Sequence, residues 1–347
     1  MPDSNASPSR TYDVAIAGAT GAVGEVLIEL LAERGFPVGR VVLLASERSA
    51  GQRLGFGGRQ LRVERLDDFD FAGVDFAFFS AGGEVSGRHA PRAAEAGAVV
   101  IDNTSRFRLD DAVPLIVPEV NGAALDEWRA NTRGGGIIAN PNCSTIQMVV
   151  ALAPLHRAAR VRRIHVSTYQ AVSGAGRRAV EELGRQTADR LNFRDPEAKV
   201  FDQPIAFNVL PRIDVLDDNG YTREEMKMHN ETRKILGDKE IAVHATAVRV
   251  PVFYGHSEAV HAELERALEL DEILGLLREA PGVVLHEGTH PTPLRDGAGT
   301  DGVHVGRVRR DHSSDCGVAM WVVSDNLRKG AALNALQIAE RLVENDA

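Results

Sequence analysis

The sequence predicts an α/β protein of two domains, in which a doubly wound, mostly parallel sheet comes first and a domain with a mixed sheet follows. The chain has 347 residues, which is enough for two hydrophobic cores. Short apolar runs alternate with helical patterns up to about residue 140, as is typical of a parallel sheet covered on both faces. After Pro141, longer strand-like segments are interrupted by helices, which indicates an α+β domain.

The expected elements follow from the periodicity of the apolar residues. In the first region we expect strands at 12–17, 40–44, 75–79, 98–101, 114–117 and 136–139, and helices at 22–32 and 91–96. In the second region we expect strands at 163–172, 241–250, 256–264 and 317–323, and helices at 143–159, 177–190, 223–236 and 271–280. An amphipathic pattern predicts a last helix at 328–344. The first domain would comprise residues 11–141 completed by 326–347, and the second residues 142–325.

Composition and charge narrow the class of protein. Apolar residues make up 44% and charged residues 26%, as in ordinary globular proteins. A formal net charge of −9 argues against a nucleic-acid partner or an anionic membrane surface. No apolar run is long enough to span a bilayer. Residues 1–10 are polar and lack the apolar core of a secretory signal, so we expect a flexible tail there.

A glycine-rich turn follows the first expected strand and opens the first helix. Residues 18–24 read Gly-Ala-Thr-Gly-Ala-Val-Gly, a G-x-x-G-x-x-G variant of the dinucleotide fingerprint. The glycines permit a close approach to a pyrophosphate, and the helix supplies N–H groups and the positive end of its dipole. The alternative is a glycine-rich turn without a ligand. The candidate cofactor-binding residues are Gly18, Thr20, Gly21, Ala22, Val23 and Gly24.

The end of the second strand indicates which dinucleotide is bound. Ser46, Arg48 and Ser49 suit a 2′-phosphate, which favours NADP over NAD. Glu47 weakens this prediction unless its side chain points away, and a solvated polar turn is the alternative. Ser80 and Gly82, after the next strongly apolar strand, are further candidates for backbone contact with the cofactor.

Two cysteines, Cys143 and Cys316, are too few for a disulfide framework or a cysteine-based zinc site. We therefore expect no metal, a reducing cytoplasmic location and free thiols. Asn142 is a good N-cap, so Cys143 would lie in the first turn of a helix, where the dipole favours a thiolate nucleophile. The alternative is an inert core cysteine. Among the histidines, His256 beside a glycine is the most suggestive partner, although local features alone leave its role open.

Ten short stretches, in a fixed order between residues 12 and 342, carry a family resemblance. With them the chain resembles aspartate-semialdehyde dehydrogenases, most of all the bacterial branch of Gram-positive and actinobacterial type. The matching stretches are GATGAVG (18–24), ASERSAG (45–51), FFSAGG (78–83), IDNTSRFR (101–108), VPLIVPEVN (113–121), ANPNCSTIQ (139–147), STYQAVSGAG (167–176), EEMKM with ETRKI (224–235), VRVPVFYGHSEAV (248–260) and SDNLRKGAALNALQIAE (324–340).

The resemblance implies a reversible, phosphate-dependent reaction that links L-4-aspartyl phosphate to L-aspartate 4-semialdehyde through NADP(H). This reaction feeds the biosynthesis of lysine, threonine, methionine and diaminopimelate. The resemblance also implies a Rossmann-type first domain and a catalytic second domain whose sheet mediates a homodimer; a tetramer is an alternative. The substrate is a small molecule, and neither a nucleic acid nor a membrane is expected as a partner.

The resemblance also implies a role for each matching residue. Cys143 would be the nucleophile, His256 the acid/base and Gln170 a residue that positions the substrate. Arg249 would bind the substrate α-carboxylate and Glu224 its α-ammonium, with Glu225 as an adjacent alternative. The remaining assignments are Arg108 and Lys227 for phosphate with Asn103 beside them, Ser46, Arg48 and Ser49 for the 2′-phosphate, Ser173, Gly174 and Gly176 for the loop near the nicotinamide, and Asn326 for its carboxamide.

Several alternatives stay open at this point. Glu224 and Lys227 are three residues apart on an expected helix and could form a routine exposed ion pair. An N-acetyl-γ-glutamyl-phosphate reductase would perform the same chemistry on a blocked amine, which would not need a carboxylate at Glu224. A catalytically silent NADP-binding sensor would show no turnover dependent on Cys143.

Overall fold

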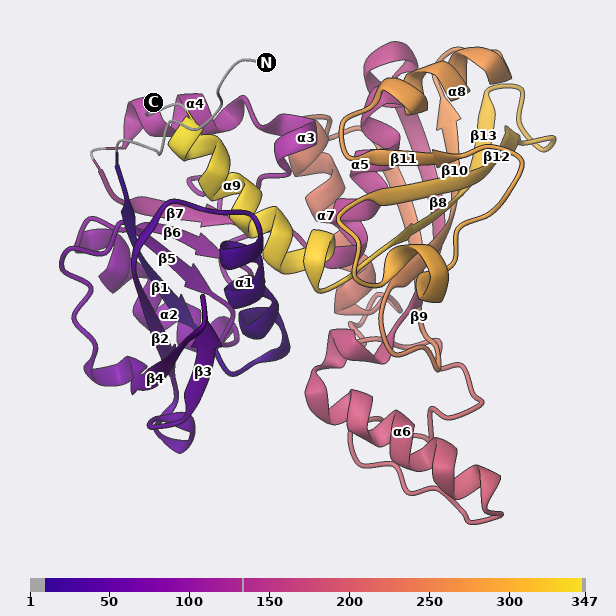
Figure 1. Cartoon of the computed structure of the whole chain (residues 1–347). Coiled ribbons are helices and arrows are strands. Elements are labelled where there is room, and N and C mark those ends of the chain that lie inside the picture. The colour runs from indigo at the N-terminus through magenta and orange to yellow at the C-terminus, as the bar shows by residue number, and fades with distance from the viewer. Residues whose placement is uncertain (1–9, 133, 345–347) are drawn as a thin grey trace, which may run out of the picture. The chain divides into compact units, whose positions relative to one another are not determined.

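The computed structural model describes residues 10–132 and 134–344. The chain divides into two compact units, the first made of Met1–Pro141 with Ala331–Ala347 and the second of Asn142–Gly330. Figure 1 shows the two sheets, with the yellow C-terminal helix among the elements of the first unit. Residues 326–330, which we expected in the first domain, lie in the second unit. Apart from Arg10, the expected N-terminal tail lies outside the described residues.

In the first unit the described residues form a seven-stranded sheet in the order β3-β4-β2-β1-β5-β6-β7. All neighbouring pairs are parallel except β3 and β4, which form an antiparallel hairpin at one edge. The strands are β1 (Tyr12–Ala17), β2 (Val38–Ala45), β3 (Arg53–Phe56), β4 (Arg59–Arg65), β5 (Phe76–Phe79), β6 (Val99–Asp102) and β7 (Gly136–Ala139). The helices are α1 (Ala22–Glu33), α2 (Gly83–Glu95), α3 (Pro118–Asn121), α4 (Ala124–Asn131) and α9 (Leu333–Glu344).

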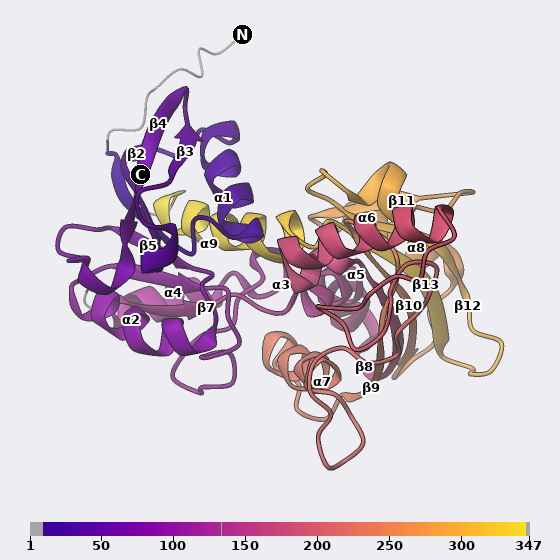
Figure 2. The ribbon, with the colours of Figure 1, turned by 90° about the horizontal axis from the view of Figure 1, so that it is seen from below.

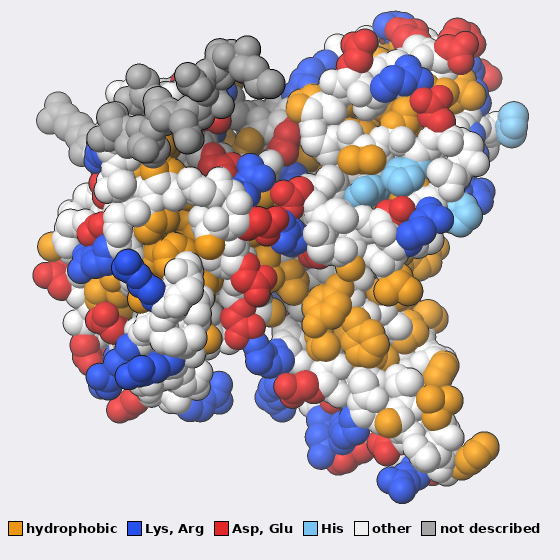
Figure 3. Space-filling view, viewed as in Figure 1, with side chains coloured by type: hydrophobic (Ala, Val, Ile, Leu, Met, Phe, Trp, Pro, Cys, Tyr) orange, Lys and Arg blue, Asp and Glu red, His pale blue; other side chains and the backbone are white. Residues whose placement is uncertain are grey.

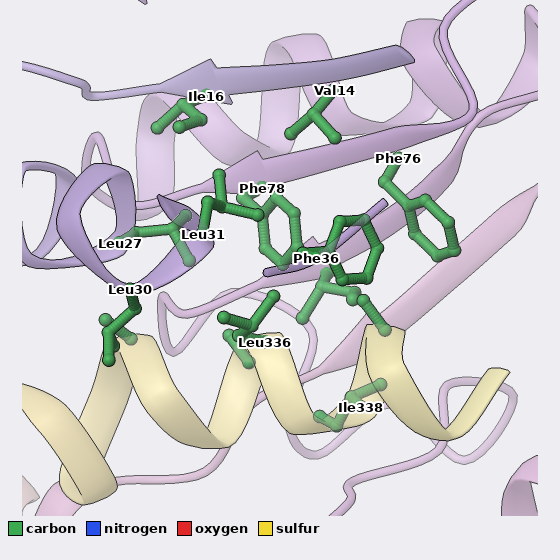
Figure 4. Packing of buried hydrophobic residues seen from close by; sticks show 14 of the residues in the cluster. Val14, Ile16, Leu27, Leu30, Leu31, Phe36, Phe76, Phe78, Leu336 and Ile338 are labelled. Carbon is green, nitrogen blue, oxygen red and sulfur yellow. The ribbon is translucent and has the colours of Figure 1, made fainter. Parts of the chain in front are cut away.

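Side chains of each strand alternate between the two faces of this sheet, and helices pack on both faces. Val14 and Ile16 of β1 and Phe78 of β5 point to the face on which α1 and α9 pack against each other. Figure 4 shows this core, in which Leu30 of α1 and Leu336 of α9 belong to one buried apolar cluster with the strands. Helix α2 contacts β5, β6 and β7 on the opposite face (Figures 1 and 2). The C-terminal helix therefore completes the core of the N-terminal domain.

The predicted strand at 114–117 is wrong. Only Leu115 forms a bridge, to Ala139, although the run is buried. Ala139 of β7 accepts from Ile116 N–H and donates to the Pro114 carbonyl, at 3.1 and 2.9 Å. Side chains bond other backbone groups of the run: Asn121 accepts from Val117 N–H and donates to the Leu115 carbonyl, while Asn334 donates to the Ile116 carbonyl. The apolar pattern therefore indicated burial correctly and secondary structure incorrectly, because side-chain amides take the place of a longer ladder with β7.

The described part of the second unit holds a six-stranded sheet in the order β11-β12-β13-β10-β8-β9. It is mixed, since β8–β9 and β11–β12 are parallel and the other pairs antiparallel. The strands are β8 (Val161–Gln170), β9 (Ala242–Arg249), β10 (His256–Leu264), β11 (Val283–His286), β12 (Val303–Arg310) and β13 (Gly317–Ser324). The helices are α5 (Cys143–Ala159), α6 (Arg177–Leu191), α7 (Arg223–Leu236) and α8 (Leu270–Glu279). The predicted α/β class, with one mostly parallel sheet and one mixed sheet, is confirmed.

Other differences concern short or polar elements. The sequence missed the hairpin of β3 and β4 and the edge pair of β11 and β12. The predicted helix at 91–96 is the end of the longer α2, which tolerates Pro91 in its interior. The predicted helix at 328–344 begins with a π-helical turn at Arg328–Ala332 before α9. Within residues 10–132 and 134–344, no helix is both long and apolar enough to cross a membrane.

Candidate active site

The glycine turn of the first unit has the geometry of an anion-binding loop. Gly18 has φ of 93°, and a Cβ there would lie 2.6 Å from the Ser80 carbonyl oxygen. A Cβ on Gly24 would lie 2.3 Å from the Gly18 carbonyl oxygen, so both positions require glycine. Gly21 precedes α1 without a side-chain cap, which leaves the N–H groups of the first turn directed at an anion.

The residues after β2 suit a phosphate group. Ser46 and Arg48 are exposed, and Arg48 makes no ion pair within the described chain. Glu47 lies 3.8 Å from the guanidinium of Arg65, which offsets its negative charge. Gly82, with φ of 95°, begins α2, also without a side-chain cap. The first unit therefore offers a glycine cradle, a helix end and a cationic side chain, which together fit a dinucleotide with a 2′-phosphate.

Arg108 is held by a chain of buried amides. Its Nη2 donates to the Asn103 carbonyl at 2.7 Å, and Asn103 Oδ1 accepts from Asn140 at 2.7 Å. Asn140 in turn accepts from Asn334 of α9 at 2.7 Å. The side chain of Arg108 is buried, so its guanidinium has a fixed position. The sequence missed Asn140 and Asn334, because their contacts join residues that are far apart in the chain.

In the second unit, Cys143 is the first residue of α5. Asn142 precedes it in an extended conformation, and Cys143 Sγ lies 3.4 Å from Asn142 Oδ1. A Cβ on Gly330 would lie 2.8 Å from Cys143 Cβ, so glycine is required for this close approach. Both cysteines of the chain are thiols. Cys143 therefore lies in the first turn of a helix, as the sequence predicted, at the end where a helix dipole favours a thiolate.

Three predicted active-site residues lie close together because the ends of their strands lie at one edge of the second sheet. Gln170 is the last residue of β8, and Arg249 is the last residue of the parallel β9 and its partner in register. His256 begins β10, which runs antiparallel to β8 and lies on its other side. The sheet therefore brings the three side chains to one edge, although they are up to 86 residues apart in sequence.

A hydrogen-bond network joins this edge to the thiol. Asn142 Nδ2 donates to Glu224 Oε1 at 3.0 Å, and Gln170 Nε2 donates to the same oxygen at 3.1 Å. Gln170 Nε2 also lies 3.4 Å from His256 Nε2. The backbone N–H of Asn142 donates to Glu231 Oε2 at 2.6 Å. Glu231 was not predicted, and it fixes the residue that precedes the nucleophile.

Glu224 is an ionised carboxylate at the centre of the network. Burial alone would raise its pKa, but Lys227 and the hydrogen bonds of the network lower the pKa to about 2. Lys227 Nζ lies 3.0 Å from Glu224 and 2.8 Å from Asp214, a residue that the sequence did not indicate. Because Glu224 is buried, its ion pair with Lys227 is not a routine exposed pair on the surface of a helix.

Glu225, the alternative to Glu224, has a structural task. Its Oε2 accepts from Thr222 N–H in a capping box at the start of α7, and its Oε1 accepts from Ala247 N–H at 2.9 Å. Both oxygens are therefore used within the fold, and Glu224 is the one that faces the network.

The surroundings of His256 fix its tautomer. The ring is buried, and Ala171 N–H donates to Nδ1 at 3.0 Å, so the proton of the neutral imidazole is on Nε2. Burial and the nearby Arg249 lower the pKa of His256 to about 3, which keeps the ring neutral. The contact between Gln170 Nε2 and His256 Nε2 joins two donors and is not a hydrogen bond. A Cβ on Gly174 would lie 3.4 Å from His256 Nε2, so glycine leaves space beside this N–H.

This burial predicts a pH-dependent stability. A histidine with a lowered folded-state pKa destabilises the fold as pH falls below its unfolded value of 6.5. Between pH 6.5 and 4.5 the loss would reach about 2–3 kcal/mol. We expect the melting-temperature advantage of the wild type over His256→Gln to shrink across this range. The exposed His312→Gln should follow the wild type, and an equal advantage at both pH values would contradict the assignment.

Arg249 carries a buried positive charge. Its Nη1 donates to the Ala171 carbonyl at 2.7 Å, while its Nε makes no hydrogen bond. Burial lowers the pKa of Arg249, and Glu224 and Cys143 oppose this effect. Within residues 10–132 and 134–344, no carboxylate lies within ion-pair distance of the guanidinium. A buried guanidinium with an unused donor is suited to an anionic ligand.

A second polar cluster lies in the loop after β8. Asn326 Oδ1 accepts from Gly255 N–H at 2.9 Å and lies 3.1 Å from Ser173 Oγ, so Asn326 links this loop to the start of β10. Gly174 is exposed, and Gly176, with φ of 89°, begins α6. The predicted nicotinamide-loop residues are therefore brought together with Asn326.

Glu258 was not predicted from the sequence. It lies two residues after His256 on the same face of β10 and is completely buried. Neither carboxyl oxygen makes a hydrogen bond, and burial raises the pKa well above its ordinary value, although Gln147 opposes this effect. Burial therefore favours the neutral form of the Glu258 carboxyl group.

Comparison with known proteins identifies the family. Residues 13–128 match "Semialdehyde dehydrogenase, NAD binding domain", and residues 152–329 match "Semialdehyde dehydrogenase, dimerisation domain". The aspartate-semialdehyde dehydrogenase of Shewanella violacea is 54% identical over 97% of this chain and 99% of its own. The chain belongs to the aspartate-semialdehyde dehydrogenase family. It is therefore an oxidoreductase with a nicotinamide-dinucleotide-binding domain and a dimerisation domain of a homo-oligomer.

Solved structures agree with this assignment. The aspartate semialdehyde dehydrogenase II of Vibrio cholerae, complexed with ASA, has a TM-score of 0.94 and 54% identity, and covers 97% of this chain and 99% of its own. The enzyme of Candida albicans with NADP has a TM-score of 0.76 and 26% identity, over 96% and 98% of the chains.

The expected Gram-positive and actinobacterial branch is not supported. The Bacillus subtilis relative is 49% identical over 96% of this chain and 98% of its own, below the relatives from Shewanella and Vibrio.

Proposed function

We propose that this enzyme reduces L-4-aspartyl phosphate to L-aspartate 4-semialdehyde and phosphate, reversibly, through a thioester on Cys143. This reaction would serve the biosynthesis of lysine, threonine, methionine and diaminopimelate. One observation carries the proposal. Asn142, which precedes the thiol, is bonded to Glu224, and Gln170 links Glu224 to the strand edge of His256 and Arg249.

The substrate groups match the charges of the second unit. Arg249, buried and with a donor unused, suits the α-carboxylate. Glu224 suits the α-ammonium, and its contact with the ammonium of Lys227 at 3.0 Å supports this role. Arg108 of the first unit, with Asn103, and Lys227 are proposed for phosphate. Asp214 would offset part of the charge of Lys227 and so limit its attraction for phosphate.

In the first step, the Cys143 thiolate would attack the acyl carbon. The C–S bond forms, the bond from carbon to the phosphate oxygen breaks, and the departing phosphate takes up one proton from water. Bound NADPH would supply a hydride, which the thioester carbon accepts to give a thiohemiacetal anion. When this anion collapses to the aldehyde, the C–S bond breaks and its electron pair returns to Cys143 as the thiolate. These steps balance without a proton being stored on a side chain.

His256 would act as a hydrogen-bond donor to the reacting oxygen. Its Nδ1 is occupied by Ala171 N–H, so its Nε2–H is the group that can face an oxyanion. The start of α5 would add backbone N–H groups. This supports the donor half of the acid/base role that the resemblance implies. Gln170 would hold the substrate side of the network through Glu224.

NADP is proposed as the cofactor. The glycine turn with Thr20, Ala22 and Val23 would hold the pyrophosphate, and Ser80 and Gly82 would approach it by their backbone. Ser46, Arg48 and Ser49 would bind the 2′-phosphate. In the second unit, the loop with Ser173, Gly174 and Gly176 and the amide of Asn326 would hold the nicotinamide.

Arg48→Ala tests this choice. We expect the KM for NADPH to rise roughly tenfold, because a charge-assisted contact with the 2′-phosphate is lost, while the KM for NADH stays unchanged. Initial rates with both cofactors measure the effect. The exposed Arg59→Ala is a matched control for loss of surface charge. An equal change with both cofactors would contradict the 2′-phosphate assignment.

A homodimer is proposed, with a tetramer as the alternative. The family match to a dimerisation domain supports it. Exposed apolar side chains gather over the part of the second unit that carries α6, as Figure 3 shows. Among them are Leu191, Phe193, Phe207, Val209, Phe253 and Tyr254. Mass determination in solution separates dimer from tetramer.

The deciding assay is phosphate-dependent reduction of NADP with L-aspartate 4-semialdehyde. Activity on the acetylated glutamyl substrate instead would favour N-acetyl-γ-glutamyl-phosphate reductase, which does not need a carboxylate for a free ammonium. Binding of NADP without any turnover would favour a sensor. Either result would overturn the proposed function.

A further inference from the structure

The segment 199–210, between α6 and α7, has neither helix nor strand, but hydrogen bonds hold it at several points along its length. We call it the 199–210 strap. Two neighbouring side chains of α6 hold its first part. Glu182 Oε2 accepts from the backbone N–H groups of Lys199 and Val200 at 2.9 and 2.8 Å. Gln186 Oε1 accepts from those of Ile205 and Ala206 at 2.8 and 3.1 Å.

Glu182 and Gln186 are built for this task. They lie four residues apart on one face of α6, and Gln186 Nε2 donates to Glu182 Oε1 at 3.1 Å. Both side chains are buried, at 3% and 0% exposure. A buried carboxylate is costly unless its oxygens are bonded, and here they accept three hydrogen bonds. This arrangement replaces a strand partner for four backbone N–H groups of the strap.

The far end of the strap is attached to Arg249. Leu210 and Arg249 exchange both backbone hydrogen bonds, at 2.9 and 2.8 Å. Near the other end, the ring centroid of Phe201 lies 6.0 Å from Arg249 Cζ, with the guanidinium over the ring. Phe201 also packs against the buried cluster of Val172 and Leu183. The strap therefore meets Arg249 twice, at its backbone and at its charged group.

We infer that Phe201 is a positioning residue for Arg249 and thereby for recognition of a substrate α-carboxylate. This inference rests on the proposed function. One nitrogen of the guanidinium is bonded to the Ala171 carbonyl, and the guanidinium carbon lies over the Phe201 ring, 6.0 Å from the ring centroid. Its Nε makes no hydrogen bond within the described chain, which leaves a donor for a carboxylate. The aromatic ring attracts the cation and so helps to hold the guanidinium in place.

The test compares two aldehydes, L-aspartate 4-semialdehyde and 3-aminopropanal, which lacks the carboxylate. With Phe201→Ala we expect the KM for aspartate semialdehyde to rise about tenfold, with kcat changed less than about twofold. The kcat/KM for 3-aminopropanal should stay at the wild-type value. Phe201→Tyr, which keeps the aromatic face, should behave as the wild type, and Phe201→Leu should recover only part of the loss.

Gln203→Ala is the control, because this side chain lies in the same strap but is exposed. Its KM should not change. Glu182→Gln should raise the KM in the same direction as Phe201→Ala, and the double variant should be no worse than the single ones, since both act through the strap.

The outcomes separate this inference from the proposed function. A wild type inactive on aspartate semialdehyde would overturn the function itself. An active wild type with an unchanged KM in Phe201→Ala would overturn the positioning role alone. An equal loss of kcat/KM on both aldehydes, or a wild-type KM in Phe201→Leu, would show that Phe201 contributes only to packing. Either result would also overturn the positioning role.

Discussion

Cys143→Ser should lose phosphate-dependent reduction of NADP by roughly 10⁴-fold or more, because serine replaces a thiolate nucleophile with a neutral hydroxyl. The change should not disturb the fold. Serine is no larger than cysteine, and the close approach of Gly330 to Cys143 Cβ is kept. Initial rates with L-aspartate 4-semialdehyde, phosphate and NADP measure the effect.

Cys316→Ser is the control for this experiment. Cys316 comes directly before β13, and its backbone carbonyl accepts from Leu264 N–H, a bond that serine retains. We expect its activity within about twofold of the wild type, as for substitutions away from special features. Activity of Cys143→Ser equal to that of the wild type would exclude the thioester mechanism.

Arg249→Met should lower kcat/KM for aspartate semialdehyde by roughly 10²–10⁴-fold, because a buried carboxylate–guanidinium contact would be lost. The KM for phosphate should change little, since Arg108 and Lys227 are proposed for that group. The same variant should melt at the wild-type temperature or above it. Arg249 is buried without a carboxylate partner in the described chain, so an apolar side chain removes an electrostatic cost.

Arg249→Lys separates charge from shape. Lysine keeps the positive charge but lacks the planar fork, so we expect activity between that of the wild type and of Arg249→Met. If Arg249→Met left the KM for aspartate semialdehyde unchanged, the proposed contact between Arg249 and the substrate α-carboxylate would be wrong. A large drop in melting temperature would show that Arg249 supports the fold instead.

The predictions that agree best with the structure rest on residues that are neighbours in the sequence. The glycine turn and the helix start at Cys143 are encoded by neighbouring residues, since Gly18, Gly24 and Asn142 act on their own turns. The α/β class followed from apolar periodicity. The edge strands β3 and β11 are short and partly exposed, so their alternation is weak. The apolar run at 114–117 reads as a strand because sequence periodicity cannot distinguish burial in a loop from burial in a sheet.

Contacts between residues of different segments could not be predicted from the sequence. Asp214 beside Lys227 and Glu231 beside Asn142 join segments 13 and 89 residues apart. The tautomer of His256 depends on Ala171, 85 residues away. The resemblance supplied the roles of the expected residues, and those roles stay predictions until the variants are measured. It gave no indication of the strap, because its motifs include neither Phe201 nor Glu182.

The place of α9 in the first core bears on how the chain is made. Leu336 and Ile338 pack against α1 and the first sheet, and Asn334 completes the amide chain behind Arg108. During synthesis, every glycine of the cofactor turn emerges from the ribosome some three hundred residues before this helix. The second unit is one continuous segment and can form its core first, whereas the core of the first unit stays incomplete until α9 has been translated. The cofactor-binding domain can therefore complete its fold only after the whole second unit has been translated.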